Sequence, residues 1–149
     1  IGLLMGFSGI LIVVFEMLLI HYTEKKYTIT KLLVFGSLFT AISFSIFSFS
    51  PTIVMLYIAI ALMSIGEMLV LPLMSTVTAF RAQKNNRGAY MGLNGISSAA
   101  AFIISPFLGT HIATDYGFDT LWIITTIVLI FVAIGYHFFT KQLFPKNMH

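Results

Sequence analysis

The sequence predicts an all-α fold, a polytopic bundle of about five transmembrane helices, and three observations lead to it. The chain of 149 residues is 58% hydrophobic and only 9% charged, whereas a typical soluble domain is about one quarter charged. Its mean hydropathy is +0.99. Its apolar residues gather in runs of about 20, the length that crosses roughly 30 Å of hydrocarbon as a helix. A soluble domain of this size could not bury so much apolar surface, so we expect the lipid bilayer to be its solvent.

Five apolar segments are long enough to span the membrane. They cover residues 1–20, 32–49, 53–80, 90–113 and 121–139. Strands are excluded because these runs are far longer than strands and do not alternate, and because backbone groups in lipid must pair within their own helix. The first residues already belong to a span, with no charged leader before them. We therefore expect residues 1–149 to be the C-terminal part of a membrane domain whose N-terminal part is missing.

The charged residues predict how the chain is oriented in the membrane. All eight Lys and Arg residues lie in the first loop, the third loop or the C-terminal tail, and alternating helices place these three on one side. The charged loop residues include Glu24, Lys25, Lys26, Arg81, Lys84 and Arg87. Because Lys and Arg in short loops favour the cytoplasmic side, we expect the C-terminus to be cytoplasmic. Tyr22 and Tyr90 near the basic loops, and Trp122 near the other side, are expected to be interfacial anchors.

Stripes of small residues predict where helices approach one another closely. The stripes are Gly2, Gly6 and Gly9 in the first span, Ser37, Ala41, Ser45 and Ser48 in the second, and Gly88, Gly92, Gly95 and Ala99 in the fourth. Spacings of three and four residues put each set on one helix face, where a neighbouring backbone can come close. The sequence therefore predicts a tightly packed bundle.

Two prolines stand inside predicted helices, Pro72 in the third and Pro106 in the fourth. Each removes an intrahelical hydrogen bond and clashes with the preceding turn. Membrane bundles tolerate such kinks. Two interpretations stay open: the kinks shape a cavity or a moving segment, or they are passive bends.

Glu67 is an acid near the middle of a predicted span. It lies fourteen residues before Arg81 and fifteen after Thr52, so it is roughly 20 Å along the helix from either end. An ionised acid at that depth costs about 2.5–3.5 kcal/mol or more. It belongs to a mostly polar stripe at spacings of three and four, made of Ser64, Glu67, Leu71, Ser75 and Thr78. We expect Glu67 to serve proton coupling or substrate contact; the alternative is a structural acid bonded to a neighbouring helix.

Two further polar residues lie within the spans. Glu16 stands five residues before His21, roughly 7 Å inside the basic boundary, where either a structural ion pair or a transport role fits. Asn94 lies early in the fourth span and is expected to be an interhelical hydrogen-bonding residue or a substrate contact. No catalytic, metal-ligand or phosphate-loop motif is found in the sequence. We therefore expect no cofactor, no metal and no enzyme activity, and the scattered basic residues argue against nucleic acid as a partner.

Four motifs follow one another along the chain. They are HYTEKKYTITK at 21–31, SIGEMLVLPLMSTVTAF with RAQKNNRGAYMGLNGIS at 64–97, SPFLGTHI at 105–112 and DYGFDTLW at 115–122. In this order they resemble the major facilitator superfamily of transporters. The first is similar to the basic loop after its second or eighth helix. The second resembles its fourth or tenth helix, a cytoplasmic loop and the next helix, which Arg87-Gly88 begins. The third is similar to the antiporter glycine–proline motif, with Ser105 in place of the leading Gly.

The resemblance implies a twelve-helix fold of two six-helix halves around a central cavity, of which this chain would supply helices eight to twelve. The drug:proton antiporter branch is the most similar. Proton-coupled secondary transport of a small molecule by alternating access, in a bacterial inner membrane, would follow, with Glu67 as a cavity acid. The partners implied are lipid, the missing N-terminal helices, the substrate and a proton. Two rival functions stay open, a non-transporting receptor or subunit and, less favoured, a membrane-embedded enzyme.

Overall fold

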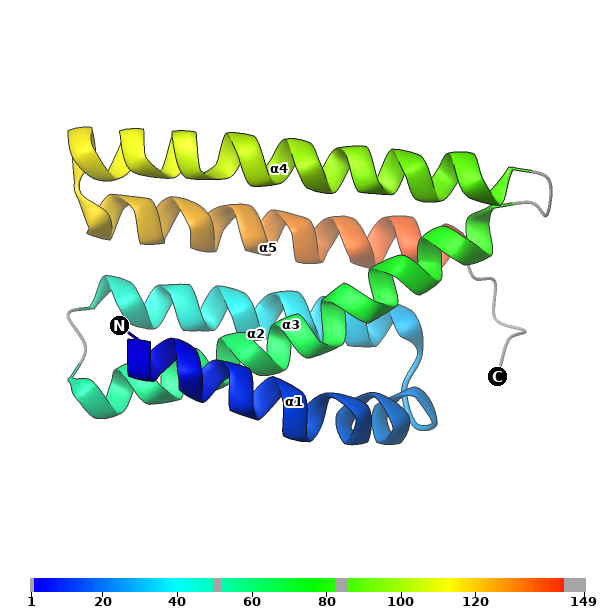
Figure 1. The fold of residues 1–149 in the computed structure, drawn as a ribbon, viewed down its shortest axis with the longest axis horizontal. Coiled ribbons are helices and arrows are strands. Elements are labelled where there is room, and N and C mark those ends of the chain that lie inside the picture. Colours follow the sequence, from blue (N-terminus) through cyan, green and yellow to red (C-terminus); the bar gives the residue numbers. More distant parts are fainter. Residues whose placement is uncertain (1, 50–51, 83–85, 144–149) are drawn as a thin grey trace.

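The computed structural model describes residues 2–49, 52–82 and 86–143, and these residues form five long helices. The helices are α1 (Gly2–Glu24), α2 (Ile29–Ser48), α3 (Ile53–Arg81), α4 (Arg87–Tyr116) and α5 (Phe118–Leu143). Each is long and apolar enough to cross a membrane. The all-α fold predicted from the sequence is therefore confirmed, with one helix for each predicted span (Figure 1).

The helices are longer than the predicted spans, and the difference lies mostly at their polar ends. The first span was expected to end at Ile20, yet α1 continues to Glu24; the fifth was expected to end at Phe139, yet α5 continues to Leu143. Apolar length marks only the part of a helix that lies in hydrocarbon. Beyond it the backbone keeps its hydrogen bonds, and the Thr23 hydroxyl donates to the Leu19 carbonyl oxygen at 2.6 Å. Helix ends in the interface were therefore placed too early.

The connections between the helices lie at two opposite ends of the bundle. The α1–α2 and α3–α4 connections lie at one end, together with the end of α5, and the α2–α3 and α4–α5 connections lie at the other (Figure 1). Exposed Lys25, Lys26 and Arg87 belong to the first set, so we call that end the basic end. At the opposite end Gly117 joins α4 to α5 with φ of +87°, a conformation that favours glycine. Its amide N–H donates to the Ala113 carbonyl oxygen at 3.1 Å and closes α4.

The packed core lies around α2. This helix packs along both α3 and α5, whereas α1 packs mainly against α3, and α4 packs against α5 and part of α3. Leu32 and Leu33 of α2 are buried together with Leu69 and Leu73 of α3. By contrast, α4 contains no buried residue. The bundle therefore has a closed side around α2 and an open side along α1 and α4.

The closest contact between helices joins α2 to α3 at two glycines. A Cβ atom at Gly36 would lie 2.7 Å from Val70 Cγ2 and 3.0 Å from the Gly66 carbonyl oxygen. A Cβ atom at Gly66 would lie 2.7 Å from the Gly36 carbonyl oxygen and would also meet Thr40. The two backbones approach so closely that neither position has room for a side chain, as in other membrane helix pairs built on small residues.

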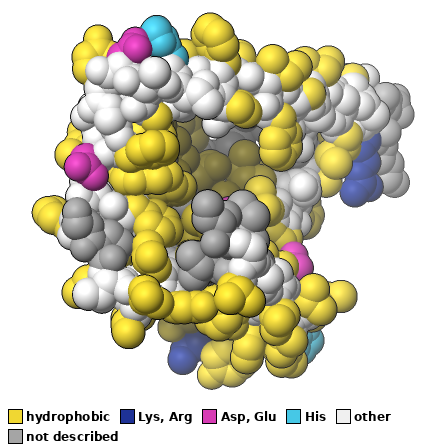
Figure 2. All heavy atoms as spheres, turned by 60° about the vertical axis from the view of Figure 1, so that its left-hand side comes forward, with side chains coloured by type: hydrophobic (Ala, Val, Ile, Leu, Met, Phe, Trp, Pro, Cys, Tyr) yellow, Lys and Arg dark blue, Asp and Glu magenta, His cyan; other side chains and the backbone are white. Residues whose placement is uncertain are grey.

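The predicted stripes of small residues have mixed outcomes. Ser37 and Ala41 of α2 are buried at 2% exposure each, which agrees with the predicted packing of that stripe. At the glycines of the α1 and α4 stripes, in contrast, a Cβ atom would meet no described atom of another residue within 4 Å. These glycines lie along the open side of the bundle, and Figure 2 shows the end opposite the basic end hollowed at its centre, with hydrophobic side chains around the hollow.

Candidate functional site

Glu67 lies on α3, one residue after the glycine that contacts α2. Its neighbour Met68 is 3% exposed and Leu71, one turn further on, is 65% exposed, while Glu67 itself is half-buried. The carboxylate therefore stands at the border between the packed and the open sides of α3. At about 100° per residue, Met74 and Thr78 lie within roughly 20° of Glu67 around the helix axis. The three residues share one side of α3, and Glu67 lies about 100° around the helix axis from Gly66.

Ser64 is fully buried one turn before Glu67 and links α3 to α1. Its hydroxyl donates to the Ile60 carbonyl oxygen at 2.9 Å, and the hydroxyl of Ser8 on α1 lies 2.8 Å from Ser64 Oγ. Since the Ser64 proton is used within α3, the Ser8 hydroxyl is the donor in this second bond. The contact is the one side-chain hydrogen bond between α1 and α3 that is found among the described residues.

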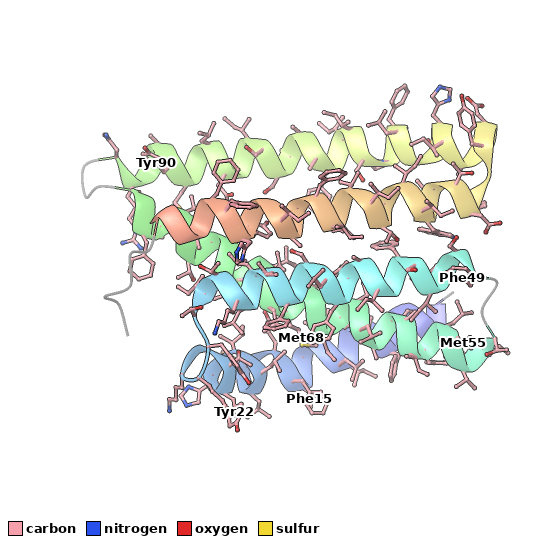
Figure 3. The ribbon with its side chains drawn as sticks, turned by 180° about the vertical axis from the view of Figure 1, so that it is seen from behind. Phe15, Tyr22, Phe49, Met55, Met68 and Tyr90 are labelled. Atoms are coloured by element: carbon pink, nitrogen blue, oxygen red, sulfur yellow. The ribbon has the colours of Figure 1, made fainter. Side chains whose placement is uncertain are left out.

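A cavity of about 340 Å³ opens between four helices toward the basic end. We call it the basic-end cavity. Its lining residues are Leu33 of α2; Met74, Val77 and Thr78 of α3; Tyr90, Leu93, Asn94 and Ser97 of α4; and Tyr136 and Phe139 of α5. Figure 3 shows Tyr90 near the basic end of α4, at the same end of the bundle as Tyr22 of α1. Two sequence-predicted residues, Asn94 and Thr78, are brought together in this cavity.

The polar groups of the basic-end cavity differ in how they are satisfied. Thr78 donates to the Met74 carbonyl oxygen at 2.9 Å and Ser97 to the Leu93 carbonyl oxygen at 2.9 Å. The Tyr136 hydroxyl lies 3.0 Å from Met74 Sδ and donates to it. The Asn94 carboxamide makes no hydrogen bond with any residue that the structure describes. An amide offers two donors and an acceptor, so the cavity wall carries an unused hydrogen-bonding group.

The remaining predicted site residues are not among the described residues that line the basic-end cavity. Glu16 is half-buried on α1, and no ion pair to it is found within residues 2–49, 52–82 and 86–143. Pro72 lies within α3. Pro106 lies within α4 and lines a second cavity, about 420 Å³, between α4 and α5.

The charged loop residues all belong to the basic end, as far as the structure describes them. Glu24 and Arg81 are the last residues of α1 and α3, and Arg87 is the first of α4. The last assignment agrees with the motif in which Arg87-Gly88 begins a helix. Lys25 and Lys26 are exposed in the α1–α2 turn, and Lys84 lies outside the described residues.

Several residues that shape these sites were not identified from the sequence. Gly36 and Gly66 fix the α2–α3 contact, and Ser8 holds Ser64. Gly66 could have been noticed because it precedes Glu67, and Gly36 because it lies four residues before Thr40. A single serine such as Ser8 carries no such signal. The contact of Tyr136 with Met74 was not identified either, because it depends on packing between α3 and α5.

The arrangement defines a class: an integral membrane protein in which a bundle of spanning helices carries a half-buried acid and an internal cavity. The family model of the Major Facilitator Superfamily matches residues 1–147. The chain therefore belongs to this family. No solved structure gives a significant match.

One curated relative matches nearly all of this chain. It is the "Uncharacterized MFS-type transporter YttB" of Bacillus subtilis (strain 168), and the identity is 28% over 143 residues. The match covers 95% of this chain but 34% of that protein. The chain thus spans about a third of the length of the curated relative that it matches.

Proposed function

We propose that the full-length protein is a secondary active transporter that moves a small molecule by alternating access and couples this movement to protons through Glu67. The observation that carries the proposal is the half-buried position of this acid within a span, at the border of the open side of the bundle. Acids within membrane spans are costly and mark substrate or proton pathways. Family membership supports the transport function, and the position of Glu67 supports its role in coupling.

The physical basis of coupling is the cost of an ionised carboxylate in a low-dielectric environment. When Glu67 faces a water-filled access path, its charge is solvated. When the path closes, the charge must be neutralised by a proton or by a cationic substrate group before the closed state can be reached. A proton and a cationic substrate that compete for one carboxylate are thereby coupled. Pro72, five residues further on in the same helix, gives α3 a position where its hydrogen bonding is already interrupted.

We further propose that the five helices are helices eight to twelve of a twelve-helix transporter in a bacterial cytoplasmic membrane, in the drug:proton antiporter branch. The N-terminal helices of the same protein would then cover the open side along α1 and α4. The basic end would be cytoplasmic, because Lys25, Lys26 and Arg87 are exposed there. The relative from Bacillus is about three times as long as the matched region. A protein of that length is long enough to contain the additional helices of this proposal.

The other predicted pathway residues take supporting roles in this proposal. Ser64 holds α1 against α3 beside Glu67 through its contact with Ser8. Asn94 lies in the wall of the basic-end cavity, where its carboxamide is available to a ligand away from Glu67. Glu16 lies on α1, the helix whose described contacts are mainly to α3, and would meet solvent or a basic group on the open side.

The role of Glu67 can be tested before the substrate is known. The full-length protein, reconstituted in liposomes, is titrated with pH while infrared spectra of the carboxylic acid carbonyl band are recorded. We expect a band that disappears as the pH rises and that is absent from Glu67→Gln. Asp119→Asn is the matched control, because it removes an exposed acid from the first turn of α5.

Transport itself is then measured in the same liposomes with an imposed pH gradient. A panel of lipophilic cations and neutral aromatic compounds is added, and collapse of the gradient is followed. Glu67→Gln is expected to abolish substrate-dependent proton movement, while Glu67→Asp keeps a titratable group and retains part of it. If Glu67→Gln moves protons with substrate as the unsubstituted protein does, Glu67 has no part in coupling.

A further inference from the structure

The basic-end cavity has the properties of a small-molecule site. Its volume of about 340 Å³ falls within the range of roughly 300–1,000 Å³ that is usual for ligand pockets. Four helices contribute to its wall, so its shape depends on the packing of the bundle. Most of the lining is apolar or aromatic, with a small number of polar groups. This mixture is typical of sites that bury most of a ligand and orient it through few hydrogen bonds.

The lining residues indicate which charge a ligand of this cavity can carry. Among the residues that the structure describes, ten line the cavity, and none of these ten is Asp, Glu, Lys, Arg or His. Burying an unpaired charge among such groups is costly. An anion or a cation would therefore lose its hydration without gaining a partner, and an uncharged ligand is favoured.

Asn94 indicates which hydrogen-bonding group on a ligand the cavity would recognise. The hydroxyl protons of Thr78 and Ser97 are donated to backbone carbonyl oxygens of their own helices, and they leave only acceptor capacity to a ligand. The Asn94 carboxamide is unpaired within the described part of the chain, and it presents both donors and an acceptor. A ligand with its own carboxamide-like donor and acceptor pairs with both sides of this group.

The aromatic residues determine the shape of the rest of the ligand. Tyr90, Tyr136 and Phe139 line the cavity from α4 and α5, and aromatic side chains bind rings through offset-stacked or edge-to-face contacts. We therefore propose that the basic-end cavity binds an uncharged aromatic small molecule bearing a carboxamide-like group, which Asn94 recognises. This site is separate from the proton site at Glu67, which lies seven residues before Met74 and thus about 10 Å away along α3.

A lipid acyl chain is the competing occupant, since the cavity lies near the basic end where anionic headgroups gather. An acyl chain has no group that pairs with Asn94, so the unpaired carboxamide favours the small molecule. Competition with phosphatidylglycerol or with benzamide distinguishes the two occupants.

Photolabelling of the full-length protein tests the proposal without any transport measurement. The probe is 4-benzoylbenzamide, an uncharged aromatic ketone with a carboxamide. On illumination its carbonyl oxygen takes a hydrogen atom from a nearby C–H bond, and the two carbon radicals join in a new C–C bond. The methyl and methylene groups beside Met74 Sδ are good donors of this hydrogen. We expect saturable labelling of peptides that contain Met74 or Tyr90, and weak labelling by the matched anion 4-benzoylbenzoate.

Three variants make the test specific. Asn94→Leu keeps the number and branching of the side-chain heavy atoms but removes the hydrogen-bonding group, and is expected to raise the half-saturating probe concentration about five- to tenfold. Ser97→Phe fills the cavity while leaving Asn94 in place, and is expected to abolish the saturable labelling even if Asn94→Leu proves unstable. Ser98→Ala is the matched control, because Ser98 is exposed on the same helix and does not line the cavity.

The remaining outcomes contradict the proposal. Equal labelling of Asn94→Leu, Ser97→Phe and the unsubstituted protein would show that the probe merely partitions into the bilayer. Labelling in detergent that phosphatidylglycerol abolishes but excess benzamide does not would assign the cavity to a lipid chain. Equal labelling by the carboxylate probe would mean that the cavity does not select uncharged ligands. None of these results depends on Glu67, so the site and the proton coupling can fail independently.

Discussion

The α2–α3 contact and the exposed face of α4 use the same small residues with opposite results. At Gly36 and Gly66 the two backbones meet and leave no room for a side chain, whereas Gly92 and Gly95 of α4 have open space around them within the described part of the chain. The difference lies in what faces each glycine: Gly36 and Gly66 each face the backbone of the other helix, whereas no described residue lies within 4 Å of a Cβ atom at Gly92 or Gly95. Glycine in a membrane helix therefore permits a close approach, and only the partner helix shows whether that approach is made.

The largest effect on stability is expected at the α2–α3 contact. Gly66→Leu would force a side chain against the Gly36 carbonyl oxygen and Thr40, and the helices would have to separate. We expect the free energy of unfolding of the full-length protein to fall by about 3 kcal/mol. The measurement is an SDS titration of the purified protein followed by circular dichroism.

Two other glycines sharpen this comparison. Gly135→Leu on α5 is the matched control, because a Cβ atom there would have no described neighbour within 4 Å, and a change below about 0.5 kcal/mol is expected. Gly92→Leu tests the open face of α4. Because the proposed N-terminal helices would cover this face, we expect Gly92→Leu to destabilise the full-length protein as well. A change below about 0.5 kcal/mol would mean that lipid, and not another helix, lies against Gly92.

The same contrast explains how far the sequence could predict the fold. The five spans and the grouping of the basic loops at one end follow from local composition, which is why they agree with the helices that the structure describes. The packing partners depend on surfaces that are far apart in the chain. The stripe containing Gly92 and Gly95 looked like a contact as much as the one containing Ser37 and Ala41, yet only the latter is buried.

The candidate sites also differ in whether a local sequence pattern or the packing of distant helices defines them. Glu67 was recognised from the sequence because an acid in a long apolar run is conspicuous by itself. The basic-end cavity was not, because it takes Tyr136 and Phe139 from α5 and Asn94 from α4, and no local pattern states that these helices meet. Asn94 was identified as a polar residue within a span. Whether its carboxamide contacts another helix or a ligand depends on how α4 and α5 pack, which the sequence does not show.

A second, smaller effect is expected at the aromatic cluster that joins α2 to α5 away from the basic end. The Trp122 ring lies 5.6 Å from the Phe44 ring, 5.5 Å from Phe47 and 6.3 Å from Phe118, measured between centroids. Trp122→Leu removes these ring contacts but keeps an apolar side chain, and should cost about 1–2 kcal/mol. Phe131→Leu on the same helix is the control, because Phe131 is 68% exposed. Equal losses in the two variants would show that exposure to lipid, and not the cluster, sets the cost.

The smallest effect is expected where the closed and open sides of the bundle are joined, at the hydrogen bond between Ser8 and Ser64. The hydroxyl oxygens are 2.8 Å apart, but hydrogen bonds between membrane helices contribute only about 0.6 kcal/mol on average. A double-mutant cycle with Ser8→Ala and Ser64→Ala should therefore give a coupling energy near this value in the SDS titration. Ser64 also donates to the Ile60 carbonyl oxygen. Ser64→Ala alone should therefore lower the free energy of unfolding by as much as Ser8→Ala does, plus at most a small contribution from this lost bond within α3. A coupling energy near zero would mean that packing alone holds α1 on α3, and α1 would then be free to separate from the closed side without breaking a specific bond.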